Sequence, residues 1–271
     1  MKIYTEPKVW LVSTTKLAEE LFDKAGEIDQ YLPGFDKWLA NAIAAEDKDG
    51  EIAVELGGRN CYHSWNNPSG RTNREYIQNI IMQQHYSVLE HGFAGFVIFA
   101  NREITHEMVR HRHQSPSQES TRYVSYGEGE KQKEPTFVVP EMFLEDPNDK
   151  VTVERYLRAV MDMYNWAHEN AAERYDKIQD RTMKRKLARQ AARGALPHWL
   201  SATIMVTGNY RAWLEAMPKR LSYHADIGIR KVYLQILDKL EDEAPNIFRG
   251  LFERKTWEDG TTYAVLRGSN D

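Results

Sequence analysis

The stretch RHRHQSPSQESTRYVSY, residues 110–126, follows an apolar run, FAGFVIFA at residues 93–100, and a short helical pattern. It holds three arginines, two histidines and four serines. Arginine binds phosphate and carboxylate oxygens in a bidentate geometry that lysine cannot reproduce, and serine hydroxyls add neutral donors. The stretch therefore predicts a site for an anionic ligand. The alternative is a solvated basic loop whose cations complement the end of a helix.

Hydrophobic patterns on both sides of this stretch predict an α+β fold. Buried strands are expected at residues 9–12, 93–100, 136–139 and 202–207. Amphipathic periodicity and capping signals predict helices near residues 16–30, 36–45, 51–62, 72–84, 103–110, 153–167, 181–193 and 229–240. The sheet is expected to be mixed or antiparallel and flanked by long helices. No repeat or composition break divides the chain, so we expect one domain over residues 51–250. A helical N-terminal extension over residues 1–50 and a C-terminal tail over residues 251–271 would complete it.

Composition restricts the classes of function. The net charge is -4 with 28% charged residues, which argues against a general nucleic-acid binder. The segment 181–193 nevertheless carries six bases and no acid, as anionic ligands near it would require. No apolar stretch is long enough for a membrane helix, and no signal-peptide core follows Met1. The sole cysteine, Cys61, excludes an internal disulfide and cysteine-rich metal sites. We therefore expect a cytoplasmic protein that does not bind membranes.

The spacing between Arg110-His111-Arg112 and Ser120-Thr121-Arg122-Tyr123 resembles the signature of the flavin-dependent thymidylate synthases. Further segments are similar to elements of that family at family-like spacings, from about residue 55 to residue 245. They are His85–His91, Arg193–Pro197, Asn209–Arg211, Arg220 and His224–Asp226.

The resemblance implies an enzyme that methylates dUMP to dTMP without a cysteine nucleophile. Methylenetetrahydrofolate would donate the carbon, and FAD reduced by NADPH would supply the hydride. Family members are homotetramers whose active sites are assembled from several subunits. This agrees with the Arg110–His113 run, because consecutive side chains on a helix point in different directions. The sequence does not distinguish a bacterial from a bacteriophage source; for a phage enzyme the compartment would be the host cytoplasm.

The resemblance also implies site residues. Those expected to contact FAD are Ser87, Arg110, His111, Arg112, Gln118, Asn209, Tyr210, Arg211 and Glu215. Those expected to bind dUMP are Glu107, Met108, Val109, Arg110, Gln118, Glu119, Ser120, Thr121, Arg122, Arg193 and Arg220. The chain departs from the family at two positions. Ser117-Gln118 replaces a common Asn-Glu pair, and Glu215 stands where Asn or His would face the flavin, which puts its role as a ligand in doubt.

Arg220 is the expected catalytic residue. Hydride transfer to the uracil ring places negative charge on the ring, and a fixed guanidinium aimed at that charge stabilises the transition state. Without the resemblance, Arg220 would be read as a surface cation. Ser120 is interpreted as a nucleotide contact, because no base is positioned to activate it as a nucleophile.

Two other functions compete with this interpretation. In a metal-dependent phosphohydrolase, imidazoles from His85, His91, His106, His111 and His113 would bind the metal. Few carboxylates accompany them, however, and no metal site is expected. In a nucleic-acid-binding module, the 181–193 face would act together with the RHRH run. Bound flavin would exclude both.

Overall fold

The computed structural model describes residues 1–66, 70–127 and 132–268. The chain forms two compact units, each built from segments that are distant in sequence. Unit 1 comprises Met1–Lys8, Ile98–Arg110 and Pro116–Met205. Unit 2 comprises Val9–Val97, His111–Ser115 and Val206–Asp271. Helices and strands both contribute extensively, so the predicted α+β class is confirmed.

A four-stranded sheet has the strand order β2-β3-β6-β4. The strands are β2 (Lys8–Thr14), β3 (Phe93–Asn101), β6 (Ser201–Asn209) and β4 (Gln114–Gln118). Strand β3 is buried along almost its whole length, as expected for an inner strand covered on both faces. The predictions of β2, β3 and β6 are confirmed. Strand β4, with the sequence QSPSQ, has no apolar side chain other than the ring of Pro116 and was not predicted.

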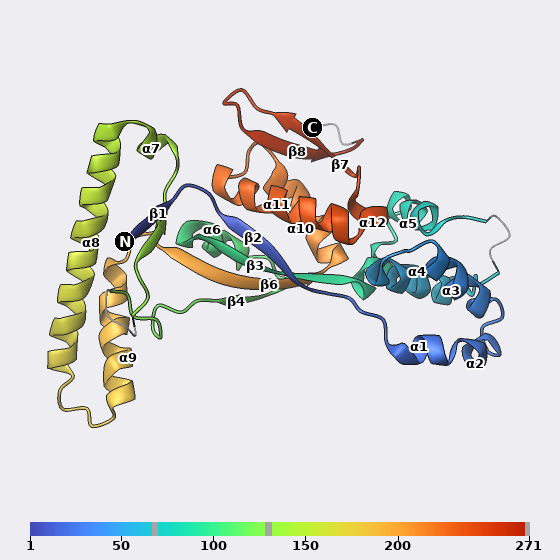
Figure 1. Ribbon diagram of the computed structural model, residues 1–271, viewed down its shortest axis with the longest axis horizontal. Coiled ribbons are helices and arrows are strands. Elements are labelled where there is room, and N and C mark those ends of the chain that lie inside the picture. Colours follow the sequence, from blue (N-terminus) through green and yellow to red (C-terminus); the bar gives the residue numbers. More distant parts are fainter. Residues whose placement is uncertain (67–69, 128–131, 269–271) are drawn as a thin grey trace. The chain divides into compact units, whose positions relative to one another are not determined.

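Unit 1 is organised around a long helical hairpin. Helix α8 (Pro147–Arg174) begins at Asp146, whose side chain accepts two backbone N–H groups, and α9 (Arg181–Ala192) begins at Asp180 in the same way. The two helices lie side by side (Figure 1). Leu157 and Tyr164 of α8 share one buried hydrophobic core with Phe137 of β5 (Thr136–Val138). Strand β1 (Lys2–Tyr4) pairs in parallel with β5. The short elements are α6 (Arg102–Met108), α7 (Met142–Glu145) and the 3₁₀ helix η2 (Arg193–Ala195).

The N-terminal part of unit 2 is helical, as predicted. Its helices are α1 (Glu19–Asp23), α2 (Ala25–Asp29), α3 (Phe35–Ala44), α4 (Asp49–Tyr62) and α5 (Asn73–Met82). The single helix expected near residues 16–30 is wrong, because the chain leaves helical geometry at Lys24 and forms α1 and α2. The rings of Phe35, Trp38 and Trp65 pack at centroid distances of 5.2–5.5 Å and form the core of this region.

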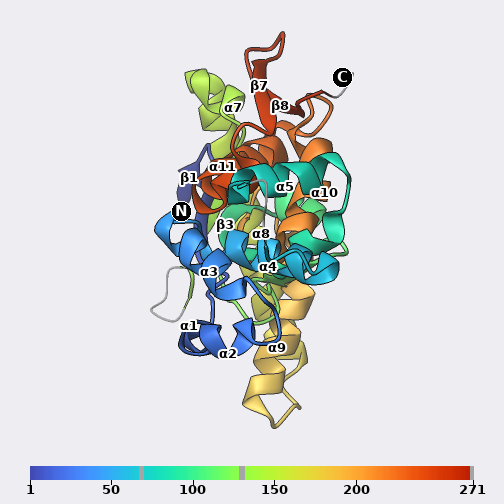
Figure 2. The ribbon, with the colours of Figure 1, turned by 90° about the vertical axis from the view of Figure 1, so that its right-hand side faces the viewer.

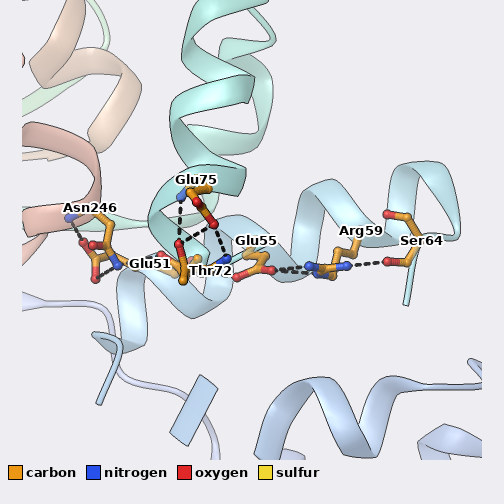
Figure 3. Close-up of polar contacts among 8 residues, drawn as sticks. Glu51, Glu55, Arg59, Ser64, Thr72, Glu75 and Asn246 are labelled. Carbon is orange, nitrogen blue, oxygen red and sulfur yellow. Dashed lines mark hydrogen bonds and ion pairs between the residues drawn. The ribbon is translucent and has the colours of Figure 1, made fainter. Parts of the chain in front are cut away.

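A buried polar network joins α4, α5 and α12 (Pro245–Phe248) (Figure 3). The Glu51 carboxylate accepts the backbone N–H of Asn246 at 2.5 Å and that of Lys48 at 3.2 Å. The Asn246 side chain donates to Glu51 at 3.2 Å and to Asn73 at 2.9 Å. One turn further along α4, Glu55 forms an ion pair with Arg59 at 2.7 Å. The network joins three helices through the buried side chains of Glu51 and Asn73 and the half-buried side chain of Asn246.

The C-terminal part of unit 2 packs two helices under a β-hairpin. Helices α10 (Tyr210–Leu221) and α11 (Ile227–Glu243) contact β8 (Thr262–Leu266), which pairs antiparallel with β7 (Phe252–Thr256) (Figure 2). Trp257 stacks on Tyr223 at 4.0 Å between ring centroids. Residues 252–266, expected only as a tail, therefore form a paired element. Among the described residues, no helix combines the length and hydrophobicity that crossing a membrane requires.

Candidate functional site

Helix α6 of unit 1 leads into the residues predicted to bind the nucleotide. Its cap is Asn101, whose side chain accepts the N–H of Ile104 at 3.1 Å. Near its end, Met108 is buried and Glu107 is half-buried, whereas Val109 and Arg110 are exposed. The Met108 side chain therefore serves the core, and Arg110 is presented to solvent.

Gln118 and Glu119 follow at the end of β4, and both side chains are held by unit 1. The Gln118 amide donates to the Thr105 hydroxyl of α6 at 2.7 Å. The Glu119 carboxylate forms an ion pair with Lys133 at 2.6 Å and accepts the Tyr126 hydroxyl at 2.8 Å. Burial raises the pKa of Glu119, but these hydrogen bonds outweigh burial and hold the pKa below its ordinary value. Glu119 thus anchors the signature loop from inside.

The loop from Ser120 to Tyr123 lies against helix α9. The backbone N–H groups of Tyr123 and Val124 donate to the Ser120 carbonyl, which closes a tight turn. Arg189 of α9 donates to the Tyr123 carbonyl at 3.1 Å, and the Lys186 ammonium lies 5.0 Å from the centre of the Tyr123 ring. Thr121 is buried, and Arg193 at the end of α9 is exposed.

Arg122 belongs to the same turn and has a hydrogen-bond donor without a partner among the described residues. Its Nε atom is buried and has no hydrogen-bond partner within the described part of the chain. Buried donors are normally satisfied, so an unpartnered guanidinium nitrogen here is consistent with a missing acceptor. An anionic oxygen would provide one.

In unit 2, the structure brings Arg220 of α10 to His111 of the signature. Arg220 Nε donates to His111 Nε2 at 3.1 Å, so this ring nitrogen is the acceptor and the imidazole proton is assigned to Nδ1. The His111 ring in turn lies 5.9 Å from the ring of buried Tyr233 on α11. The guanidinium of the predicted catalytic residue is therefore oriented by a side chain that was predicted to contact FAD.

Arg211 is also held in a fixed orientation. Its guanidinium pairs with Glu90 of the 3₁₀ helix η1 (Tyr86–His91) and with Glu215 one turn along α10, both at 2.7 Å. The hydrogen bonds that Arg211 donates to Glu215 and Glu90 raise its pKa above the ordinary value. The Glu215 carboxylate, whose role as a flavin ligand the sequence left in doubt, thus serves here as the partner of Arg211. Glu90 lies within the His85–His91 segment, but the sequence did not predict that it pairs with Arg211.

Asn209 and Tyr210 both have structural roles in unit 2. The Asn209 side chain caps α10 by accepting the Ala212 N–H at 2.8 Å. The Tyr210 ring is fully buried, and a Cβ placed at Gly50 or Gly92 would come within 2.3 Å of it. These two glycines leave room for the ring. Any contact of Tyr210 with a ligand would therefore have to use its backbone.

A cavity of about 370 Å³ brings two of the predicted flavin residues together in unit 2. Ser87 and Arg211 both line it, together with His85, Tyr62 and Cys61. Cys61 is exposed, and its place beside Arg211 was not apparent from the sequence, where it is far from the binding motifs. A larger cavity of about 600 Å³ lies between α3 and α4 and contains none of the predicted residues.

Comparison with known proteins shows the family of the chain. The sequence model of a family described as "Thymidylate synthase complementing protein" matches residues 42–246. A protein of Mycobacteroides abscessus is 40% identical over 223 residues, which cover 81% of this chain and 86% of the relative. A protein of Mycobacterium avium is 41% identical over 227 residues, with the same coverage, and one of Corynebacterium efficiens is 39% identical over 221 residues, covering 79% and 84%. All three are named flavin-dependent thymidylate synthase.

The chain belongs to the flavin-dependent thymidylate synthase family. The resemblance found in the signature is thereby confirmed, and with it the interpretation as an enzyme that uses a flavin. The competing interpretations receive no support. Within the described residues, no three His, Cys, Asp or Glu side chains form a group that could hold a metal ion.

The residues present fit the flavin that membership of the family implies. FAD carries a diphosphate, and the exposed guanidinium groups of Arg110 and Arg112 form no ion pair with any described carboxylate. Arginine at such positions is suited to bidentate contacts with phosphate oxygens. Ser87 and Arg211 add a hydroxyl and an oriented cation at a cavity.

Proposed function

We propose that the protein catalyses the reductive methylation of dUMP to dTMP, with methylenetetrahydrofolate as carbon donor and NADPH as the source of electrons. Bound FAD, once reduced, supplies the hydride. The proposal rests on the hydrogen bond from Arg220 to His111. It holds the guanidinium of the expected catalytic residue in one orientation, in a chain that belongs to this family.

The nucleotide set is Glu107–Arg110, Gln118–Arg122, Arg193 and Arg220. In this set Arg122 and Arg193 take the phosphate, and the turn at Ser120 supplies a hydroxyl. Lys186 and Arg189 hold this turn through Tyr123, and Glu119 holds it through Lys133. The turn is therefore preorganised before substrate arrives, which lowers the entropic cost of binding.

The flavin set is Ser87, Arg110–Arg112, Gln118, Asn209–Arg211 and, through its pairing with Arg211, Glu215. Arg110 and Arg112 neutralise the diphosphate. Glu90 and Glu215 keep the Arg211 fork in one orientation.

Arg220 is the catalytic residue of the proposal. When hydride reaches the uracil ring, negative charge develops on the ring, and the guanidinium stabilises it without giving up its own proton. His111 is a positioning residue, because its Nε2 accepts from Arg220 and directs the remaining N–H groups of the fork. No cysteine takes part.

The working enzyme is a cytoplasmic homotetramer in which neighbouring chains complete each active site. The family resemblance supports this assembly. The expected divergence of helical side chains over Arg110–His113 does not, because α6 ends at Met108 and residues 109–113 lie outside any helix. Residues 51–250 form the catalytic domain, preceded by the extension over residues 1–50.

Flavin binding tests the proposal. We expect the purified protein to bind FAD, and NADPH to bleach the flavin absorbance in the absence of oxygen. Arg112→Ala should weaken FAD binding, whereas Arg158→Ala, which removes an exposed arginine of α8, should not. A folded protein that binds no FAD at saturating concentrations would exclude the proposed function.

A further inference from the structure

Helix α9 carries a row of arginines that the proposed reaction on dUMP does not use in full. Arg181, Arg185 and Arg189 of α9 and Arg193, its C-cap and the first residue of η2, follow one another at four-residue intervals. We call these four residues the arginine row. Residues four apart are neighbours on the surface of a helix, so the row forms one continuous ridge. Arg181, Arg185 and Arg193 are exposed. Helix α9 is labelled beside α8 in Figure 1.

The row is unfavourable for the helix that carries it. Like charges four residues apart repel each other, and here three such pairs follow in succession. Cations in the first turns also oppose the helix dipole, and the first turn of α9 contains no acidic residue. Within the described chain, none of the four arginines forms an ion pair with a carboxylate. Among the described residues, one cation of α9 has an acidic partner: Lys184 pairs with Asp176 at 2.6 Å.

The row leads to the nucleotide turn. Arg189 contacts the Tyr123 carbonyl, and its Nε is buried without a partner in the described structure. Arg193 ends the row and belongs to the nucleotide set of the proposed function. One nucleotide phosphate occupies one end of the ridge and leaves the charges of Arg181 and Arg185 uncompensated.

We propose that the arginine row binds the oligoglutamate tail of the folate co-substrate, a linear polyanion attached through γ-carboxyl groups. The spacing favours this ligand. Successive arginines are separated by about 6 Å along the helix axis, from four residues at a rise of about 1.5 Å. Standard bond lengths give an extended γ-glutamyl unit a repeat of roughly 6 Å, which matches the spacing of the row. Because the repeat has an odd number of chain atoms, the α-carboxylates of an extended tail alternate in direction, and every second one faces the guanidinium groups. The proposal rests on the proposed function, which supplies the folate.

Binding of the tail alone tests the proposal without any turnover. Fluorescently labelled γ-linked pentaglutamate is titrated with the FAD-loaded protein and followed by anisotropy. We expect saturable binding that weakens as salt rises, because exposed ion pairs are screened. Arg181→Gln with Arg185→Gln should weaken it on the order of tenfold, from the loss of two exposed charge pairs. Arg155→Gln with Arg158→Gln removes the same charge from exposed positions of α8 and should leave binding unchanged. The lysine pair Arg181→Lys with Arg185→Lys should keep most of the affinity.

Kinetics give the second readout. The KM for pentaglutamyl methylenetetrahydrofolate should lie on the order of tenfold below that for the monoglutamate, and the glutamine double variant should remove most of this ratio. No binding of pentaglutamate by the wild-type protein, or an unchanged ratio in the double variant, overturns the proposal. So does binding of a single-stranded RNA that pentaglutamate cannot displace, which would make the row a nucleic-acid surface. Absence of turnover with either folate, with pentaglutamate still bound, would instead count against the proposed function.

Discussion

At the scale of single residues, the chemistry depends on how Arg220 is held. Its Nε is committed to His111, so the rest of its planar fork faces a defined direction. A lysine at this position would offer a mobile point charge. In Arg220→Lys we expect the rate at saturating dUMP to fall on the order of 100- to 1000-fold, the usual effect of losing one preorganised electrostatic contact. Flavin binding should survive.

Single-turnover oxidation of the reduced flavin measures that rate. Arg193→Lys is the matched control, because a phosphate contact should raise the dUMP requirement more than it lowers the saturated rate. A near wild-type rate for Arg220→Lys at saturation would remove Arg220 from the catalytic role.

Glu119 has a structural role, because its carboxylate pairs with Lys133 and so supports the turn that is proposed to bind dUMP. In Glu119→Gln the Tyr126 hydroxyl keeps an acceptor, but Lys133 loses its ion pair. We expect dUMP affinity to fall roughly fivefold, as for the loss of a partly buried pair, with kcat little changed. Calorimetric titration of dUMP measures the change, and Glu141→Gln, at an exposed site, is its control. Equal dUMP affinities in the wild type and Glu119→Gln would show that the pair does not support the turn.

The sign of the pH effect follows from the lowered pKa of Glu119. A carboxyl whose pKa is lower in the folded protein contributes stability above its ordinary value, 4.5, and loses it as pH falls through the lowered pKa. The support that Glu119 gives to the turn should therefore be complete at neutral pH.

At the scale of elements, the network around Glu51 behaves in the opposite way. Burial raises the pKa of Glu51 to about 7, despite hydrogen bonds from the backbones of Asn246 and Lys48. The folded state then holds a proton that the unfolded chain releases near 4.5, so stability falls as pH rises between these two values. Glu51→Gln should flatten this dependence, by about 1–3 kcal/mol over the window.

Chemical unfolding at several pH values between about 5 and 8 measures the free energy of unfolding across and just above the interval between the two pKa values. Glu46→Gln, at an exposed neighbouring position, should retain the wild-type dependence. If Glu51→Gln retains it as well, the Glu51 carboxyl does not titrate in this range.

Elements with a strong apolar pattern were predictable from sequence, and others were not. The apolar runs of β3 and β6 and the spacing of Val153, Leu157 and Tyr164 in α8 predict that these residues are buried, and they are. Tyr156, which fits the same spacing, is exposed. Strand β4 gives no such signal, because its sequence is polar. It is extended because it pairs with β6 in the sheet. The hairpin of β7 and β8 depends on packing of Trp257 on Tyr223, a contact that no local pattern contains.

The same division applies to the candidate site. The signature marks where ligands are expected, because arginine and serine density can be read locally. The residues that hold those side chains come from elsewhere in the chain. Glu90 lies 121 residues before Arg211, and His111 lies 109 residues before Arg220. Such pairs exist only after folding.

At the scale of the whole molecule, the account requires more than one chain per active site. Arg112→Ala and Arg193→Ala should each be nearly inactive. If the two defects fall on different chains of one site, mixing the variants under conditions of subunit exchange should restore part of the activity, up to about one quarter of sites in a randomly mixed assembly. Steady-state dTMP formation measures the recovery. A fully active monomer in sedimentation would reject the shared site.

The most direct measurement of the central claim is an anaerobic single turnover. The FAD of the Cys61→Ala protein is reduced with NADPH, excess reductant is removed, and dUMP is added with methylenetetrahydrofolate. We predict that flavin absorbance returns and that dTMP appears in equal amount to the flavin oxidised, although the chain then contains no cysteine. Formation of dTMP without flavin oxidation, or its complete loss in a folded Cys61→Ala protein that binds FAD, would contradict the account.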